Sequence, residues 1–174
     1  MKQAIGLVGV ALAILLIVVF VPAWGRQRLD TKDTAFVKEA CQGGMLEVKL
    51  GEQALQNASS EDVKRFAKRM VDDHGKASKE LEGLIKNKGV TVSTNLETKN
   101  QQVIDKLSKL KGPEFDREYM RQMVADHQQD LADFQKASTN LQDPDIKAWV
   151  MKTLPTLNEH LREAKEIQNK VDKK

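Results

Sequence analysis

The chain has 174 residues, 30% of them charged, with 28 Lys and Arg against 25 Asp and Glu. Basic and acidic residues are mixed along the chain, without a long basic run or stacked aromatics, which excludes an evident nucleic-acid-binding surface. The single cysteine, Cys41, excludes both a disulfide framework within the chain and a zinc site built from cysteines.

An uncharged apolar segment, AIGLVGVALAILLIVVFVPAW, covers residues 4–24. About 20 apolar residues in a helix span a membrane, whereas the apolar part of a signal peptide is usually shorter. We therefore expect residues 1–25 to be a transmembrane anchor, with a cleaved signal segment as the alternative because Val21, Pro22 and Ala23 resemble a cleavage site. Residues 26–33 are expected to be a linker, and residues 34–174 one domain with a real core.

Amphipathic periodicity predicts two long helices and a short one in the first part of this domain. The first long helix covers 34–57 and carries Glu47 within its apolar stripe. The second begins at Ser59 or Ser60, where Ser59 and Asp62 have the spacing of a capping box, and it ends before Gly89. The short helix covers 96–110.

Two further long helices follow. The third is expected to begin at Pro113 and to fade over 138–142. The fourth follows Asp143 as N-cap and Pro144 as first helical residue, and Pro155 is expected to kink it. Short connections between these helices predict an all-α, up-down four-helix bundle with a short extra helix, preceded by the transmembrane helix.

The three histidines, His74, His127 and His160, each follow an acidic residue and lie on the apolar face of a predicted helix. The segment MVDDH around His74 returns as MVADH around His127. Because about three in seven helix positions face a core, all three would face inward by chance about one time in thirteen. The repeat is therefore a candidate ligand set, although duplication of a helical hairpin would also explain it.

The heights of the histidines and Glu47 along their helices can be compared. At about 1.5 Å per residue, Glu47 and His74 differ in height by roughly 6 Å, and His127 and His160 by roughly 8 Å. All four can thus share one layer of the bundle, where such folds build metal sites. Three imidazoles and a carboxylate suit zinc, iron, manganese or copper. The alternative is a set of core histidines, each hydrogen-bonded to a carboxylate or carbonyl.

Other acidic residues accompany the histidines. Asp130 and Glu163 follow His127 and His160 by three residues and share their faces, which suits partners that orient an imidazole; otherwise they are surface carboxylates. The acids directly before the histidines point about 100° away and are expected to be solvated or one step outside the site. The Glu-x-x-His pattern of di-iron bundles is missing from the sequence, and no separate acid–base pair is evident, which favours a binding or structural role over an enzyme.

Four segments occur in order: DTAFVKEACQGGMLEVKLGEQAL, VKRFAKRMVDDHGKASKEL, FDREYMRQMVADHQQDLADF and LPTLNEHLREAKEI. Together they resemble the bacterial domain-of-unknown-function family 4142, over about residues 33–171. The resemblance implies a ferritin-like helical bundle that is exported, with Glu47, His74, His127 and His160 as its motif positions, and it supplies no reaction. The expected function is a membrane-anchored bundle in the periplasm that binds a transition metal. The alternative is a structural accessory subunit of a larger membrane protein complex.

Overall fold

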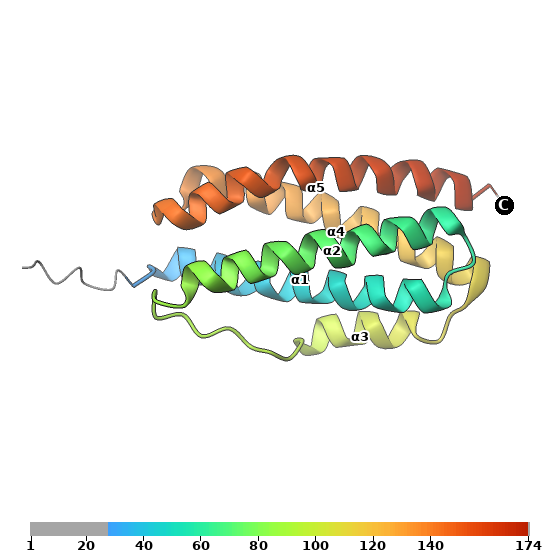
Figure 1. The fold of residues 1–174 in the computed structure, drawn as a ribbon, viewed down its shortest axis with the longest axis horizontal. Coiled ribbons are helices and arrows are strands. Elements are labelled where there is room, and N and C mark those ends of the chain that lie inside the picture. The colour runs from blue at the N-terminus through green and yellow to red at the C-terminus, as the bar shows by residue number, and fades with distance from the viewer. Residues whose placement is uncertain (1–27, 174) are drawn as a thin grey trace, which may run out of the picture.

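The computed structural model describes residues 28–173, which form five helices and no strand. The predicted all-α fold class is therefore confirmed for this part of the chain. The helices are α1 (Thr31–Asn57), α2 (Glu61–Ile85), α3 (Thr98–Leu107), α4 (Gly112–Asn140) and α5 (Pro144–Val171) (Figure 1).

The predicted membrane anchor, residues 1–25, lies outside the described residues. From residue 28 to residue 173, no helix combines the length and the apolar composition that crossing a bilayer requires. Anchoring, a periplasmic location and attachment to a membrane complex therefore remain predictions.

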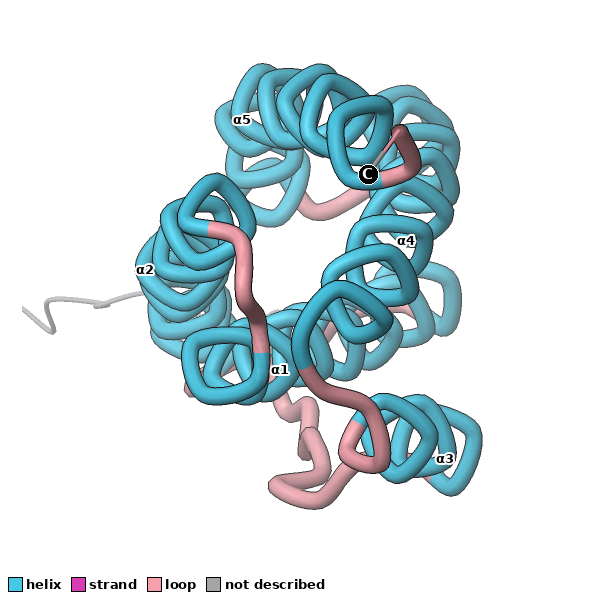
Figure 2. Tube along the Cα trace, turned by 90° about the vertical axis from the view of Figure 1, so that its right-hand side faces the viewer, coloured by secondary structure: helices cyan, strands magenta, loops and turns pink. Residues whose placement is uncertain are grey.

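The four long helices form a square in which α1 and α5 lie on opposite corners, as do α2 and α4 (Figure 2). Helices α1 and α5 run in one direction, and α2 and α4 run in the other (Figure 1). The link 86–111, which includes α3, runs back along the bundle and packs α3 on the outside of α1 and α4. This corrects the expected up-down order with short connections, because α2 and α4 are parallel and their link crosses the length of the bundle.

Two buried aspartates fix the turns at the two ends of the bundle. Asp33 of α1 accepts hydrogen bonds from the backbone N–H groups of Gln142 and Asp143, at 3.1 and 2.6 Å, in the α4–α5 turn. Asp116 of α4 accepts from the backbone N–H groups of Ser59 and Ser60, at 3.0 and 2.9 Å, in the α1–α2 turn. Each hairpin thus supplies the carboxylate that satisfies the turn of the other hairpin.

The predicted starts of two helices have different outcomes. Asp143 caps α5 as expected, because its side chain accepts from the backbone N–H groups of Asp145 and Ile146, both at 3.1 Å. The capping box predicted at Ser59 does not form. Its hydroxyl donates to Asp116 at 2.6 Å, and Ser60 takes the N-cap position without a side-chain cap bond. Asp116 also accepts from the backbone N–H of Ser59, the group that the Asp62 side chain would bond in a capping box.

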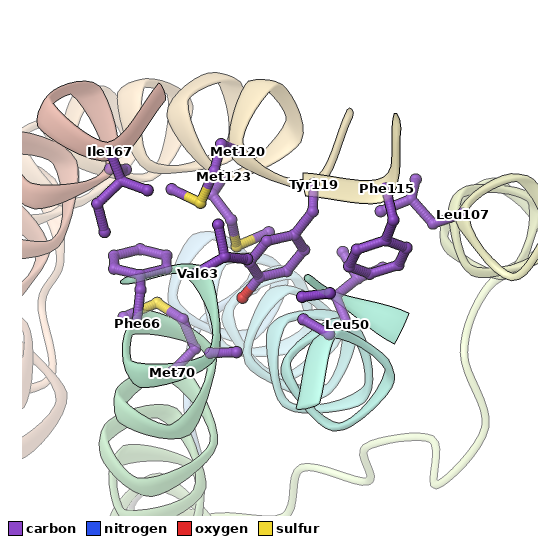
Figure 3. Close-up of a cluster of buried hydrophobic side chains, with 14 of the residues drawn as sticks. Leu50, Val63, Phe66, Met70, Leu107, Phe115, Tyr119, Met120, Met123 and Ile167 are labelled. Carbon is purple, nitrogen blue, oxygen red and sulfur yellow. The ribbon is translucent and has the colours of Figure 1, made fainter. Parts of the chain in front are cut away.

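Two apolar clusters fill the bundle on either side of a polar layer. One cluster lies at the end where α1 meets α2, and it includes Leu50, Val63, Phe66, Met70, Leu107, Phe115, Tyr119, Met120, Met123 and Ile167 (Figure 3). The other lies at the end where α4 meets α5, and it includes Val37, Leu81, Ile85, Leu131, Phe134, Ile146, Trp149, Val150 and Leu157. The layer between them contains the residues that the sequence singles out.

Candidate metal centre

Each of the four long helices contributes one residue to the polar layer. Glu47 of α1, His74 of α2, His127 of α4 and His160 of α5 are 2%, 7%, 0% and 1% exposed. One ligand atom from each of the three histidines lies within 4.8 Å of the other two. The three ring centroids are 5.3 to 5.5 Å apart. The structure thus brings together all four residues that helical rise had placed at similar heights.

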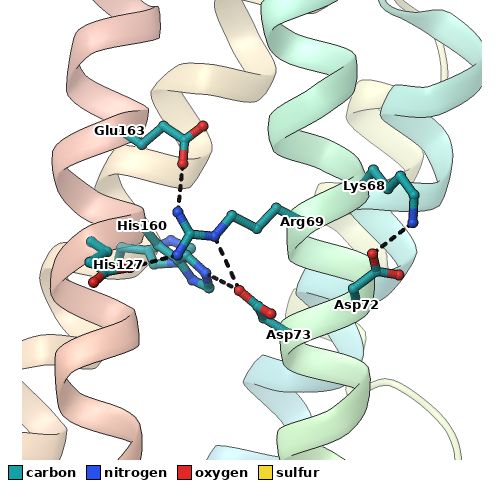
Figure 4. A network of polar contacts seen from close by, with 8 residues as sticks. Lys68, Arg69, Asp72, Asp73, His127, His160 and Glu163 are labelled. Atoms are coloured by element: carbon teal, nitrogen blue, oxygen red, sulfur yellow. Dashed lines mark hydrogen bonds and ion pairs between the residues drawn. The ribbon is translucent and has the colours of Figure 1, made fainter.

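Each imidazole bonds outward through one ring nitrogen. Nδ1 of His127 is 2.9 Å from the backbone oxygen of Met123, and Nε2 of His160 is 2.8 Å from Oδ2 of Asp73 (Figure 4). Nδ1 of His74 is 2.7 Å from Oε2 of Glu47. A carbonyl oxygen or an ionised carboxylate can only accept, so these partners assign the proton of His127 and His160 to the outward nitrogen, and that of His74 as well when Glu47 is ionised.

The second ring nitrogen of each histidine points inward as a lone pair. Nε2 of His127 and Nδ1 of His160 face each other at 3.3 Å. Nε2 of His74 is buried, and within residues 28–173 it has no hydrogen-bond partner. With the outward nitrogens protonated, two acceptors face each other without a donor between them, an arrangement that a cation would satisfy.

The spacing of these nitrogens fits a metal ion. Tetrahedral zinc sites have metal–nitrogen bonds of about 2.0–2.1 Å, which puts neighbouring ligand nitrogens about 3.3–3.4 Å apart. The 3.3 Å between His127 and His160 matches that edge. The His127–His160 pair thus has the spacing of a metal site, and the third imidazole belongs to a set of ligand atoms that all lie within 4.8 Å of one another. Three imidazole ligands would leave a further coordination position for another ligand.

Burial decides which groups of the layer carry charge. It lowers the pKa of His74 to about 4 and that of His160 to about 3, and it also lowers the pKa of His127. All three imidazoles are thus neutral near pH 7, which is the form that binds metals. Burial also raises the pKa of Glu47 to about 7, and its interaction with His127 lowers this pKa by less.

The two carboxylates predicted to orient histidines lie one step further out. Asp130 is half-buried and hydrogen-bonds to Glu47, and burial together with the charge of Glu47 raises its pKa to about 9. Glu163 accepts from Nη1 of Arg69 at 2.9 Å. Neither carboxylate is required as a hydrogen-bond partner of an imidazole, because the outward nitrogens of His127 and His160 already have other partners.

Arg69 is the site residue that sequence reasoning missed, whereas Asp73 lies one step outside the site, which is one of the two positions expected for it. Asp73 lies on the face of α2 that meets α5, so its side chain contacts His160 and not the adjacent residue His74. Burial would raise the pKa of Asp73, but the hydrogen bonds from His160 and Arg69 lower it overall. The guanidinium of Arg69 also bonds Glu159 and Glu163 of α5, at 2.7 and 2.9 Å (Figure 4). The only sequence signal for this network is the i,i+4 spacing of Arg69 and Asp73.

The site is closed by apolar packing toward the cluster shown in Figure 3. The ring of Phe66 lies 6.4 Å, between centroids, from both His127 and His160. This side of the layer is therefore dry and of low polarity, which strengthens electrostatic interactions inside it.

Comparisons with known proteins place this fold. The structure of a DUF305 fragment from Deinococcus radiodurans superposes with a TM-score of 0.72 at 14% identity, covering 82% of this chain and 99% of that chain. CopM in the Cu(II)-bound form gives 0.67 at 19% identity, covering 79% and 96%, and CopM in the Cu(I)-bound form gives 0.64 at 20% identity, covering 77% and 93%. No curated protein matches significantly. The family model for a domain of unknown function, DUF4142, matches residues 22–167, and the chain belongs to that family.

Proposed function

We propose that this protein binds one transition-metal ion through Nε2 of His74, Nε2 of His127 and Nδ1 of His160. The observation that carries the proposal is the facing pair of lone pairs at 3.3 Å, beside a third buried nitrogen that has no partner among the described residues. A hydrogen-bonded core would instead be expected to pair a donor with each acceptor.

Glu47 takes a different role from the one its sequence position suggests. Its Oε2 contacts the outward nitrogen of His74, and its Oε1 lies 3.4 Å from the outward nitrogen of His127. A carboxylate on that side orients the imidazole and makes it a better ligand, as metal sites commonly require. We therefore assign Glu47 to the support of His74 and replace the predicted ligand role. Asp73 supports His160 in the same way.

Copper is the ion we propose among the four that the sequence allowed. Imidazole ligands suit copper, zinc and iron, whereas manganese prefers oxygen ligands. Among divalent ions bound by one site, copper usually binds most tightly. CopM, which shares the fold, has been solved in Cu(I)-bound, Cu(II)-bound and Ag-bound forms, which supports this choice.

Metal content provides the test. Protein without a histidine tag, purified without chelators and loaded with Cu(II), should contain one ion per chain by elemental analysis. Its electron paramagnetic resonance spectrum should show nitrogen hyperfine coupling. His127→Ala and His160→Ala should lose stoichiometric copper, because each leaves two of three ligands.

Asp116→Asn is the matched control. Asp116 is also a buried polar residue with a structural role, since it bonds the α1–α2 turn, but it lies outside the histidine layer. This variant should lose stability and still bind one copper ion. Wild-type protein without stoichiometric copper, or a His127→Ala variant that binds copper as wild type does, would contradict the proposal.

A further inference from the structure

A cleft between α2 and α5 leads from the surface to the histidines. It has a volume of about 130 Å³, and its lining includes His74, His160, Asp73, Lys76, Lys152 and Thr156. A larger groove of about 630 Å³ lies between α1 and α4, and it reaches Glu47 and Asp130 but none of the three histidines. Of these two openings, only the α2–α5 cleft reaches the imidazoles.

Ion pairs between α2 and α5 bracket this cleft. At one end Arg69 bonds Glu159 and Glu163, and at the other Lys152 bonds Glu80 at 2.8 and 3.0 Å. These contacts join the two helices above and below the opening and leave the space between them to smaller side chains. On the opposite side of the imidazoles, Phe66 packs against two of the rings.

The two acids that line the cleft, Asp73 and Glu80, are matched by two lysines, Lys76 and Lys152. Asp73 is bonded by Arg69 and Glu80 by Lys152, so each acid of the cleft already has a cationic partner. A metal ion bound at the base of the cleft would therefore make it positive and favour a negative ligand. Since a water molecule takes up about 30 Å³ in the liquid, the cleft has room for a ligand of a few non-hydrogen atoms.

We propose that this cleft binds a small anionic ligand, which occupies the metal coordination position that the three histidines leave open. This inference rests on the proposed function, because the anion binds the ion as well as the cleft. The proposed function assigns only the ion and its histidine ligands, whereas this inference adds that a ligand from solution can reach the bound ion.

Azide is the probe for this site. Full-length protein loaded with Cu(II) should bind azide, with a new charge-transfer absorption band and a changed electron paramagnetic resonance spectrum. Thr156→Phe fills the half-buried lining of the cleft and should weaken azide binding about tenfold or more, by overpacking, with copper content unchanged. Lys76→Met, on an exposed side chain, should weaken azide binding by a few-fold without risk to the fold.

Gln129→Phe is the control, because Gln129 is exposed and lines the α1–α4 groove. It should bind azide as wild type does. Copper-loaded protein whose spectra do not respond to azide overturns the inference and leaves the proposed metal site intact. A Thr156→Phe variant with wild-type azide affinity, or a Gln129→Phe variant with weakened affinity, also overturns it. A chain that takes up no copper, detected by elemental analysis before azide is added, overturns both proposals.

Discussion

A neutral imidazole has one donor nitrogen and one acceptor nitrogen, and its outward partner decides which is which. In this protein the outward partners are a carboxylate for His74, a backbone carbonyl of the same helix for His127, and a carboxylate of another helix for His160. Three different partners therefore produce the same result, an acceptor nitrogen directed to the middle of the layer. This agreement argues for selection of the inward lone pairs and against a set of unrelated core histidines.

The protonation of the layer gives a pH-dependent stability for metal-free protein. The unfolded chain protonates its histidines near pH 6.5, and the folded protein does so only near pH 4 or below, so the stability they contribute is present above pH 6.5 and lost as pH falls. Glu47 and Asp130, with pKa values of about 7 and about 9, act in the opposite direction. Their contribution is present at low pH and is lost as pH rises through those values.

In the folded protein, carboxyl groups of the layer change their protonation between pH 6.5 and 8.5, whereas the three histidines stay neutral. We therefore predict that the free energy of unfolding of metal-free protein decreases over this range, measured by urea unfolding in the presence of a chelator. Asp130→Asn should flatten the dependence, since its amide does not titrate. Glu114→Gln, an exposed change on the same helix, should leave it as it is. A pH-independent wild type would show that the Asp130 carboxyl is not held protonated by burial.

The four residues of the layer could be predicted because helical rise and an apolar face are properties of each helix alone. The contact of Asp73 with His160 could not be predicted. The position of Asp73 one residue before His74 excludes a contact with His74, but it does not tell which neighbouring helix lies on that side. The contact of Glu47 with the outward nitrogen of His74 could not be predicted either, because a shared height does not specify which ring nitrogen a carboxylate contacts.

At the scale of elements, two glycines set how closely α1 packs on α2. A Cβ atom at Gly44 would lie 2.7 Å from Oγ of Ser78. At Gly51 it would lie 2.8 Å from Cγ2 of Val71 and 2.9 Å from the backbone oxygen of Ala67. A glycine within a helical pattern permits a neighbour to approach closely, but the sequence does not reveal which residue does so.

We predict that Gly51→Ala destabilises the protein by about 1–3 kcal/mol, because the backbone of Ala67 cannot move aside as a side chain would. Gly83→Ala is the control: nothing lies within 4 Å of a Cβ atom there, so better helix propensity should raise stability by up to about 1 kcal/mol. Chemical denaturation of both variants measures the difference. Equal stabilisation by the two substitutions would show that α1 and α2 have room to separate.

The helices themselves followed from periodicity and from stop signals, and α5 follows its predicted N-cap. The arrangement of the helices in the bundle could not be predicted from these signals. The apolar stripe of each helix is the same whether α2 is followed by a short turn or by a link that crosses the bundle. The link lies along α1 and α4 because α3 packs there, with Val103 and Ile104 against the cluster of Figure 3. The capping box failed for a similar reason, since Asp116 is distant in sequence from Ser59.

In the whole molecule, the helices pack mainly as two hairpins, α1 with α2 and α4 with α5. The contacts of α1 with α4 and of α2 with α5 are less extensive. Polar contacts join the hairpins along their length: the Asp33 bonds at one end, the Asp116 bonds at the other, and the α2–α5 ion pairs and the histidine layer between them. His74 belongs to one hairpin, whereas His127 and His160 belong to the other, so a bound ion would link the two.

We predict that Cu(II) raises the thermal unfolding temperature of the full-length protein by linking the hairpins. An ion present at about 100 times its dissociation constant contributes about 2.7 kcal/mol, which corresponds to several degrees for a domain of this size. His74→Ala leaves two ligands on one hairpin, so it can retain weak copper binding but should lose the increase in unfolding temperature. Asp116→Asn, which weakens the junction at a different point, should melt lower than wild type without metal and show the same increase with copper. If His74→Ala gained as much from copper as wild type, the ion would be bound within the α4–α5 hairpin and would not join the two halves of the bundle.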